Sequence, residues 1–145
     1  MNSGSTDSET MFALALTFGL MEEPLEALER MAGFVEETGR AHGIEHPLQM
    51  TLGVSDGDRL FAVRYSSIGK SRTLFHSADA RTLRALYPDH ELVNDIGDED
   101  RAVVSEPLGD LPGVWEEIPE ATALIVQDGP DEQRAFRPRV REGIA

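Results

Sequence analysis

The sequence predicts an α+β fold in which two helices cover one face of a mainly antiparallel sheet. Residues 6–43 carry apolar side chains at helical spacing, whereas apolar and polar side chains alternate from Leu48 onward. The later segments are short and are separated by turns that contain glycine or proline. This order is typical of helices that gather on one side of a sheet.

The first helix is expected to begin at Thr6. The tetrapeptide from Thr6 to Glu9 has the S/T-x-x-E form of a capping box, with Thr6 as N-cap. Residues 10–18 are apolar on nearly every side, which predicts burial against both a sheet and a neighbouring helix. We therefore expect truncation of Leu14 or Leu16 to lower the free energy of unfolding by about 2–5 kcal/mol.

A second, amphipathic helix is expected from Pro24 to about Gly43. Its apolar face is expected to carry Leu25, Leu28, Ala32 and Val35. The opposite face is expected to carry the glutamates Glu26, Glu29, Glu36 and Glu37.

The rest of the chain is expected to form strands. Residues 48–54 and 60–65 predict a hairpin around an Asp-Gly turn. Further strands are expected at 73–77, 102–105, 123–126 and 133–136, with a short helix at 80–87 and irregular connections at 95–101 and 107–119. Several strands are apolar on both sides, so helices on one side alone would leave an exposed apolar face. Residues 1–145 are expected to be one partial domain in which residues 138–145 form a loose tail.

The charge of the chain argues against several classes of partner. Its 145 residues include 13 Lys plus Arg and 27 Asp plus Glu, which gives a net charge of −14. Such a chain repels phosphate backbones and anionic lipid heads, so we expect neither a nucleic acid nor a membrane as partner. The apolar stretch from Met11 to Met21 is too short to span a bilayer, and we expect a cytoplasmic protein.

The sequence carries no motif for a metal, a cofactor or a covalent nucleophile. It lacks cysteine, which excludes disulfides, thiolate metal sites and a cysteine nucleophile within these residues. A Gly-Lys-Ser tripeptide ends at Ser71, but Arg64 occupies the place of the first glycine of a phosphate-binding loop. The acidic run from Asp95 to Asp100 lacks the ligand alternation of an EF-hand, and the histidines lack metal-ligand spacing. We expect no cofactor, no metal and no catalytic residue.

Asp7 has two interpretations on spacing alone. In the first turn of a helix its carboxylate favours the positive end of the helix dipole. A carboxylate at a helix start can also face outward and hold an ammonium group. Spacing leaves both interpretations open.

Several segments together resemble the class II glutamine amidotransferases, whose catalytic domain has an N-terminal nucleophile. The stretch Gly-Ser-Thr-Asp-Ser-Glu from Gly4 is similar to the family's Thr-Asp-Ser/Thr-Glu segment. Residues 55–67 resemble its hairpin with an Asp-Gly turn and an Ala-x-Arg strand, and residues 74–77 resemble its next strand. Residues 103–108 resemble the Ser-Glu-Pro-Leu signature of the stand-alone bacterial branch, and residues 115–119 the stretch before the following strand.

The resemblance implies a four-layer αββα sandwich that hydrolyses the amide of glutamine and passes the ammonia to an acceptor. In the family an amino-terminal cysteine is the nucleophile, and its own α-amino group is the base. This chain resembles only the back half, without that cysteine, the arginine that binds the substrate carboxylate, or the Asn-Gly pair of the oxyanion hole. The resemblance implies that Asp7 binds the α-ammonium of glutamine and that Ser5 and Thr6 shape its loop.

Three functional hypotheses follow. The first is an amidotransferase-like chain that is inactive alone because the cysteine half is absent. The second is a non-catalytic interaction module, such as a homodimer that covers its open sheet face. The third is one half of a split enzyme whose front half is a separate chain. For Arg64, Glu106 and Trp115 we expect a packing or salt-bridge role rather than catalysis.

Overall fold

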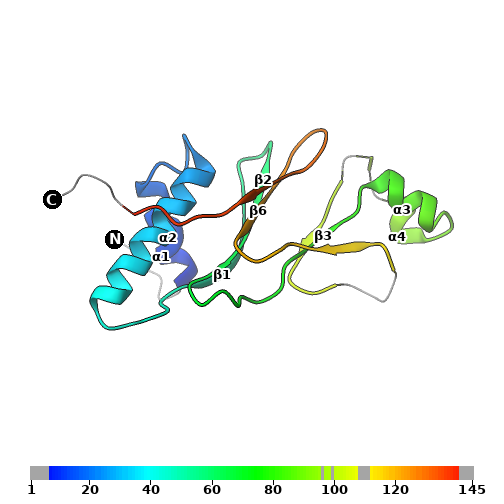
Figure 1. Cartoon of the computed structure of the whole chain (residues 1–145). Coiled ribbons are helices and arrows are strands. Elements are labelled where there is room, and N and C mark those ends of the chain that lie inside the picture. The colour runs from blue at the N-terminus through cyan, green and yellow to red at the C-terminus, as the bar shows by residue number, and fades with distance from the viewer. Residues whose placement is uncertain (1–6, 96, 99, 108–111, 141–145) are drawn as a thin grey trace.

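Helices and sheets form four successive layers across the molecule (Figure 1). The computed structural model describes residues 7–95, 97–98, 100–107 and 112–140. The helices are α1 (Asp7–Thr17), α2 (Pro24–Ala41), α3 (Ala80–Leu86) and α4 (Glu91–Asn94). The strands are β1 (Gln49–Ser55), β2 (Leu60–Ser66), β3 (Phe75–Ser77), β4 (Val103–Val104), β5 (Trp115–Glu117), β6 (Thr122–Val126) and β7 (Glu132–Ala135). The predicted α+β class is confirmed.

The first sheet has the strand order β1-β2-β6-β7, and all its pairs are antiparallel. The predicted hairpin joins β1 to β2, with Ser55 paired to Leu60. Asp56 Oδ1 accepts hydrogen bonds from the backbone N–H groups of Asp58 (2.9 Å) and Arg59 (2.7 Å), and Gly57 takes the positive φ of 96° that the turn requires. Local turn chemistry therefore fixes the register of this hairpin.

A second sheet, of order β4-β3-β5, was not predicted from spacing, but it agrees with the αββα sandwich that the family resemblance implies. Its strand β5 lies within the predicted irregular connection at 107–119 and pairs with β3, so that Phe75 lies opposite Glu117. Alternation along a strand reports which side chains share a face, but it carries no information about the partner strand. The short helix α4 was also missed, whereas α3 agrees with the predicted helix at 80–87.

Apolar clusters fill the spaces between the layers. The largest lies between the first two helices and the first sheet and includes Met31, Phe61 and Val63. The next lies between the sheets and contains Ala62, Leu74, Ile118 and Leu124, with Val103 and Val126 against it. The last packs α3 and α4 beside the second sheet and contains Leu83, Val93 and Val114. The second sheet thus covers the face of β2 that we expected to be open, which explains why this strand is apolar on both sides.

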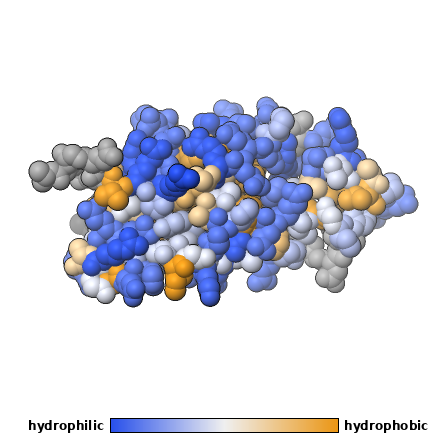
Figure 2. All heavy atoms as spheres, in the orientation of Figure 1, coloured by the Kyte–Doolittle hydropathy of each residue, from blue (hydrophilic) through white to orange (hydrophobic). Residues whose placement is uncertain are grey.

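Helix α1 packs against α2 and is less buried than expected. Ala15 is its buried residue, whereas Phe12 is 53% and Leu16 is 42% exposed. The expectation that α1 is covered by both a sheet and a helix is wrong for its outer face, because no described layer lies over it. The surface seen in Figure 2 is mainly hydrophilic, with apolar residues in scattered groups.

Two glutamates of α2 are buried, which corrects their predicted place on a solvated face. Glu36 is 6% exposed and accepts hydrogen bonds from Tyr65 Oη (2.5 Å) and Ser67 Oγ (2.6 Å) of the first sheet. Burial, and then the hydrogen bond to Glu36, raises the pKa of the Tyr65 phenol well above its usual range. Glu29 is 4% exposed, and its carboxylate binds the C-terminal segment.

The segment after β7 is attached to α2, whereas we expected a loose tail. The N–H of Arg137 donates to Glu29 Oε2 (2.7 Å), and Arg139 Nε donates to Glu29 Oε1 (3.0 Å). A Cβ at Gly33 would lie 2.0 Å from the Arg139 carbonyl oxygen, so a residue without a side chain is required at this approach. The tail expectation is therefore wrong up to Arg139, and residues 141–145 lie outside the described part.

Candidate functional site

Asp7 lies at the first position of α1, as predicted, and its side chain is exposed. Within the described residues, no hydrogen bond or ion pair is formed by its carboxylate. Ser5 and Thr6 lie outside the described residues, so the capping box and the loop that they were expected to shape stay predictions. The geometry that can be assessed is that of Asp7 itself.

Asp7 lines a cleft of about 530 Å³ between α1 and β1, which we call the α1–β1 cleft. Ser8 lies beside it at the N-terminal turn of the helix. The rest of the lining comes from Met11, Phe12, Ala15, Leu20, Leu28, Met31 and residues 49–54. The lining of the cleft is therefore mainly apolar and includes one acidic residue, Asp7.

Strand β1 forms one wall of this cleft and is an edge of the first sheet. Among the described residues it pairs with β2 alone, so the other side of its backbone has N–H and C=O groups without a strand partner. Met50 is buried under the helices, whereas Leu52 and Val54 are half-buried. The sequence predicted this strand but gave no sign that it lies at an edge, because that depends on its neighbours in space.

The chemistry available in the α1–β1 cleft is recognition rather than covalent catalysis. A carboxylate can hold an ammonium group through charge-assisted hydrogen bonds. The hydroxyl groups of the lining belong to Ser8 and Thr51, and the lining holds no histidine or lysine to activate them. The full sequence contains no cysteine. The cleft can position a small cation-bearing ligand, but these residues supply no nucleophile for it.

Arg64 lies elsewhere, between the two sheets, and its predicted salt-bridge role is confirmed. It is 7% exposed; its Nη1 donates to Glu117 Oε2 (2.8 Å) and to the Ile118 carbonyl (2.7 Å), and its Nε donates to Ser71 Oγ (3.1 Å). The backbone N–H and the hydroxyl of Ser71 donate to Glu120 Oε1. We call Arg64, Ser71, Glu117 and Glu120 the Arg64 cluster.

The carboxylate of Glu120 illustrates the electrostatics of this cluster. Burial acts to raise its pKa, but the hydrogen bonds from Ser71 and the nearby Arg64 outweigh burial and hold the pKa below its usual range. Ser71 ends the Gly-Lys-Ser tripeptide, so this serine is engaged in structure rather than in phosphate binding. Trp115 packs against the third apolar cluster, and Glu106 is exposed.

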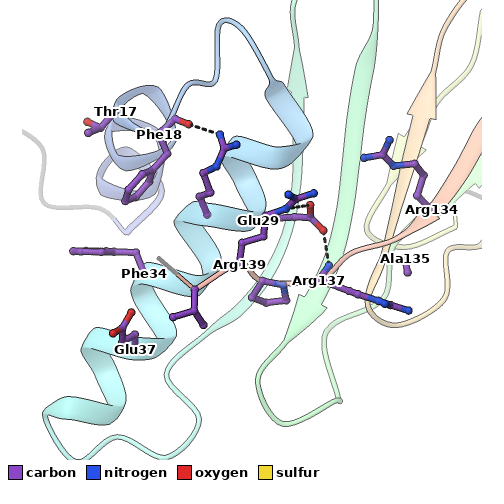
Figure 3. A pocket seen from close by; sticks show the side chains of 12 residues that line it. Thr17, Phe18, Glu29, Phe34, Glu37, Arg134, Ala135, Arg137 and Arg139 are labelled. Carbon is purple, nitrogen blue, oxygen red and sulfur yellow. Dashed lines mark hydrogen bonds and ion pairs between the residues drawn. The ribbon is translucent and has the colours of Figure 1, made fainter. Parts of the chain in front are cut away.

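A second, larger groove of about 1000 Å³ lies on the other side of the helices, beside the C-terminal segment (Figure 3). Its aromatic part is the tilted pair Phe18 and Phe34, with ring centroids 5.7 Å apart. Arg30 donates to the Phe18 carbonyl (3.0 Å) and pairs with Glu23 (2.9 Å). None of the residues predicted for the site lies in this groove.

The described residues contain no group of three or more histidine, aspartate or glutamate side chains arranged to hold a metal ion. The same part of the chain has no helix that is both long and apolar enough to cross a membrane.

No protein-family model matches the sequence, and comparison with curated proteins gives no match. Among solved structures, the chain is similar to a glutamine aminotransferase class-II domain protein from Silicibacter pomeroyi, with a TM-score of 0.76 and 33% sequence identity. The alignment covers 94% of this chain and 54% of that protein, so the chain spans about half the length of its structural relative. The chain has a class II glutamine amidotransferase-like fold, which confirms the resemblance seen in its motifs.

Proposed function

We propose that this chain is the carboxy-terminal portion of a glutamine-hydrolysing amidotransferase domain, in which Asp7 binds the α-ammonium group of L-glutamine. The observation that carries the proposal is Asp7, which lines the α1–β1 cleft and whose carboxylate has no partner among the described residues. The likeness to a glutamine aminotransferase class-II domain protein supports it.

The proposed reaction cleaves the amide of glutamine to glutamate and ammonia, which is transferred to an acceptor. Its covalent step needs a nucleophile and a base, and the α1–β1 cleft offers neither. The nucleophile would come from residues that correspond to the part of the relative beyond this chain. We therefore propose that the chain alone binds glutamine without hydrolysing it, and that a complete site forms with a front half, whether covalently joined or separate.

Amide chemical shifts of the chain test the binding role of Asp7 directly. We expect L-glutamine to shift the amide resonances of residues 50–54, and Asp7→Asn to weaken this effect about tenfold, which is the loss of a modest ion pair. Glutaramic acid, which is glutamine without its α-amino group, should bind the original chain as weakly as glutamine binds the variant. Asparagine is also a favourable residue at a helix start, so the fold should persist.

Glu9→Gln is the matched control, because it removes a carboxylate from the same helical turn but lies outside the α1–β1 cleft lining. Equal glutamine affinity in Asp7→Asn and in the original chain would contradict the proposal. So would a drop in melting temperature as the main effect of Asp7→Asn, because Asp7 would then serve the helix. Release of ammonia from glutamine by the purified chain would contradict its proposed inactivity.

The free edge of β1 favours a second candidate, a non-catalytic interaction module. An exposed edge strand beside apolar surface is a template for pairing with another chain, which here would be a second copy. An obligate interface of this kind should keep the chain dimeric below micromolar concentration, which sedimentation can measure. A monomer at that concentration would exclude this candidate.

For a split enzyme, mixing this chain with a separate front half should restore glutamine hydrolysis. The cytoplasmic location stays a prediction.

A further inference from the structure

The turn between β6 and β7 is fastened to the second sheet by charged side chains. Arg101, which precedes β4, donates from Nη2 to the Gly129 carbonyl (2.7 Å) and from Nη1 to the Gln127 carbonyl (3.3 Å). Its Nε lies 3.2 Å from Asp131 Oδ1 at the end of the same turn. The turn belongs to the first sheet, so these contacts cross the space between the sheets.

His76 of β3 lies beside this junction with both ring nitrogens facing carboxylates. Its side chain is 9% exposed, and its Nε2 lies 3.4 Å from Glu116 Oε2, whereas its Nδ1 lies 3.9 Å from Asp131 Oδ2. Neither nitrogen forms a hydrogen bond, and both are shielded from solvent. We call His76, Glu116, Asp131, Asp79 and Arg101 the His76 cluster.

Proton counting shows that a neutral His76 cannot donate to Glu116 and Asp131 together when both carboxylates are ionised. A neutral imidazole has one N–H donor and one lone pair, while an ionised carboxylate only accepts hydrogen bonds. One ring nitrogen must therefore present its lone pair to a carboxylate oxygen. A protonated imidazole carries an N–H on each nitrogen and can donate to Glu116 and Asp131 together.

Negative charge is in excess among the other members of the cluster. Asp79, Glu116 and Asp131 contribute three carboxylates, against which Arg101 supplies one guanidinium, so negative charge is in excess. Burial raises the pKa of Asp131; Arg101 and His76 lower it, and Asp79 and Glu116 raise it further. The net direction is upward, with burial as the largest cause.

We propose that the His76 cluster is a proton-operated latch between the two sheets. Protonated His76 bridges Glu116 of β5 and Asp131 of the β6–β7 turn and holds that turn against the second sheet. When His76 loses its proton, one of the two contacts is lost and the turn opens more often. Histidine is suited to this role because its side chain changes charge between about pH 5 and 8.

Hydrogen exchange of the backbone amides at 127–129 and 131 tests the latch. After correction for the intrinsic pH dependence of exchange, we expect protection of these amides to fall about tenfold between about pH 6 and 8, the equivalent of one pKa unit of coupling. In His76→Gln, protection should be independent of pH across this range. Glu116→Gln, which removes the negative charge of one of the two acceptors at an exposed position, should reduce the pH dependence and serves as the second variant if His76→Gln does not fold.

His42→Gln is the matched control, because His42 is exposed and its ring is bonded to the Thr38 carbonyl within its own helical turn. It should keep the pH dependence of the original chain. The latch is overturned if protection in the original chain does not change with pH, or if His76→Gln or Glu116→Gln retains the full change. Chemical shifts of the His76 ring protons provide a readout that a merely structural histidine would not give, because they should move over the same pH range as the amide protection.

Discussion

The Arg64 cluster and the His76 cluster cross the same space between the sheets but differ in how their hydrogen bonds are satisfied. Arg64 is paired with Thr122 at the start of β6, whereas the His76 cluster holds the turn that follows this strand. The guanidinium of Arg64 finds acceptors at 2.7, 2.8 and 3.1 Å. The ring nitrogens of His76 face carboxylates at 3.4 and 3.9 Å without a hydrogen bond.

The difference shows that the two ends of one strand can respond differently to pH. A guanidinium is protonated at every pH that a protein tolerates, so Arg64 keeps its N–H donors to Glu117 and to the Ile118 carbonyl over the range in which a histidine can lose one. An imidazole between two carboxylates lacks one donor until it is protonated. We therefore interpret the Arg64 cluster as a permanent link and the His76 cluster as a conditional one.

The largest expected effect is that of Arg64→Met, which breaks the permanent link. It removes the donor to Glu117 and to the Ile118 carbonyl, and it leaves Glu120 with Ser71 alone. Each buried polar group left unpaired costs about 1–3 kcal/mol, so we expect a total loss of about 3–5 kcal/mol. Urea unfolding would measure this loss in the free energy of unfolding. Arg64→Lys keeps the positive charge but not the planar guanidinium group, and it should lower the free energy of unfolding less than Arg64→Met does. A loss below about 1 kcal/mol in Arg64→Met, the range of an exposed pair, would contradict the assignment.

Leu124→Ala tests the apolar contact that lies between the two polar clusters. Leu124 is fully buried between the sheets, and its truncation should lower the free energy of unfolding by about 2–4 kcal/mol. Leu16→Ala is the control. This leucine is exposed, so its truncation should change the free energy of unfolding by no more than about 0.5 kcal/mol. This small change replaces the larger loss of stability that we expected for Leu16 from the sequence. Equal losses in the two variants, measured by thermal unfolding, would show that the sheets are not held by this contact.

Asp131→Asn has the smallest expected effect and sharpens the contrast in pH response. Because burial raises the pKa of Asp131, the folded chain keeps this proton to a higher pH than the unfolded chain does. The resulting contribution to stability is present below the unfolded pKa and is lost as pH rises through the raised value. The free energy of unfolding of the original chain, relative to Asp131→Asn, should therefore fall from acid toward neutral pH. A difference in the free energy of unfolding, measured with urea, that stays constant between the two chains across this pH range would contradict a raised pKa of Asp131.

The sequence predicted elements well where local residues decide the structure. The turn at Gly57 and the helix that begins at Pro24 follow from side chains within a few residues of each end. Strand β5 was missed because its partner β3 lies about forty residues earlier in the chain. Glu29 and Glu36 were placed on a solvated face because helical periodicity cannot reveal the arginine, tyrosine and serine that meet them in the fold.

For the candidate site, the motifs predicted Asp7 but not its surroundings. The family resemblance singled out this carboxylate, and the structure places it in a cleft with β1. That β1 is an edge depends on the order of strands in space, which alternation does not specify. The His76 cluster was beyond sequence reasoning, because its members come from β3, β5 and the β6–β7 turn.

The contact between Glu29 and Arg139 sets a limit on how early the chain can finish folding during synthesis. Arg139 is made 110 residues after Glu29, and a ribosome adding about 5–20 residues per second needs roughly 5–20 s to cover that distance. Throughout this time α2 carries a carboxylate whose final partners do not yet exist. A nascent chain stalled before Arg139 should therefore present α2 in an incompletely packed state to chaperones and proteases.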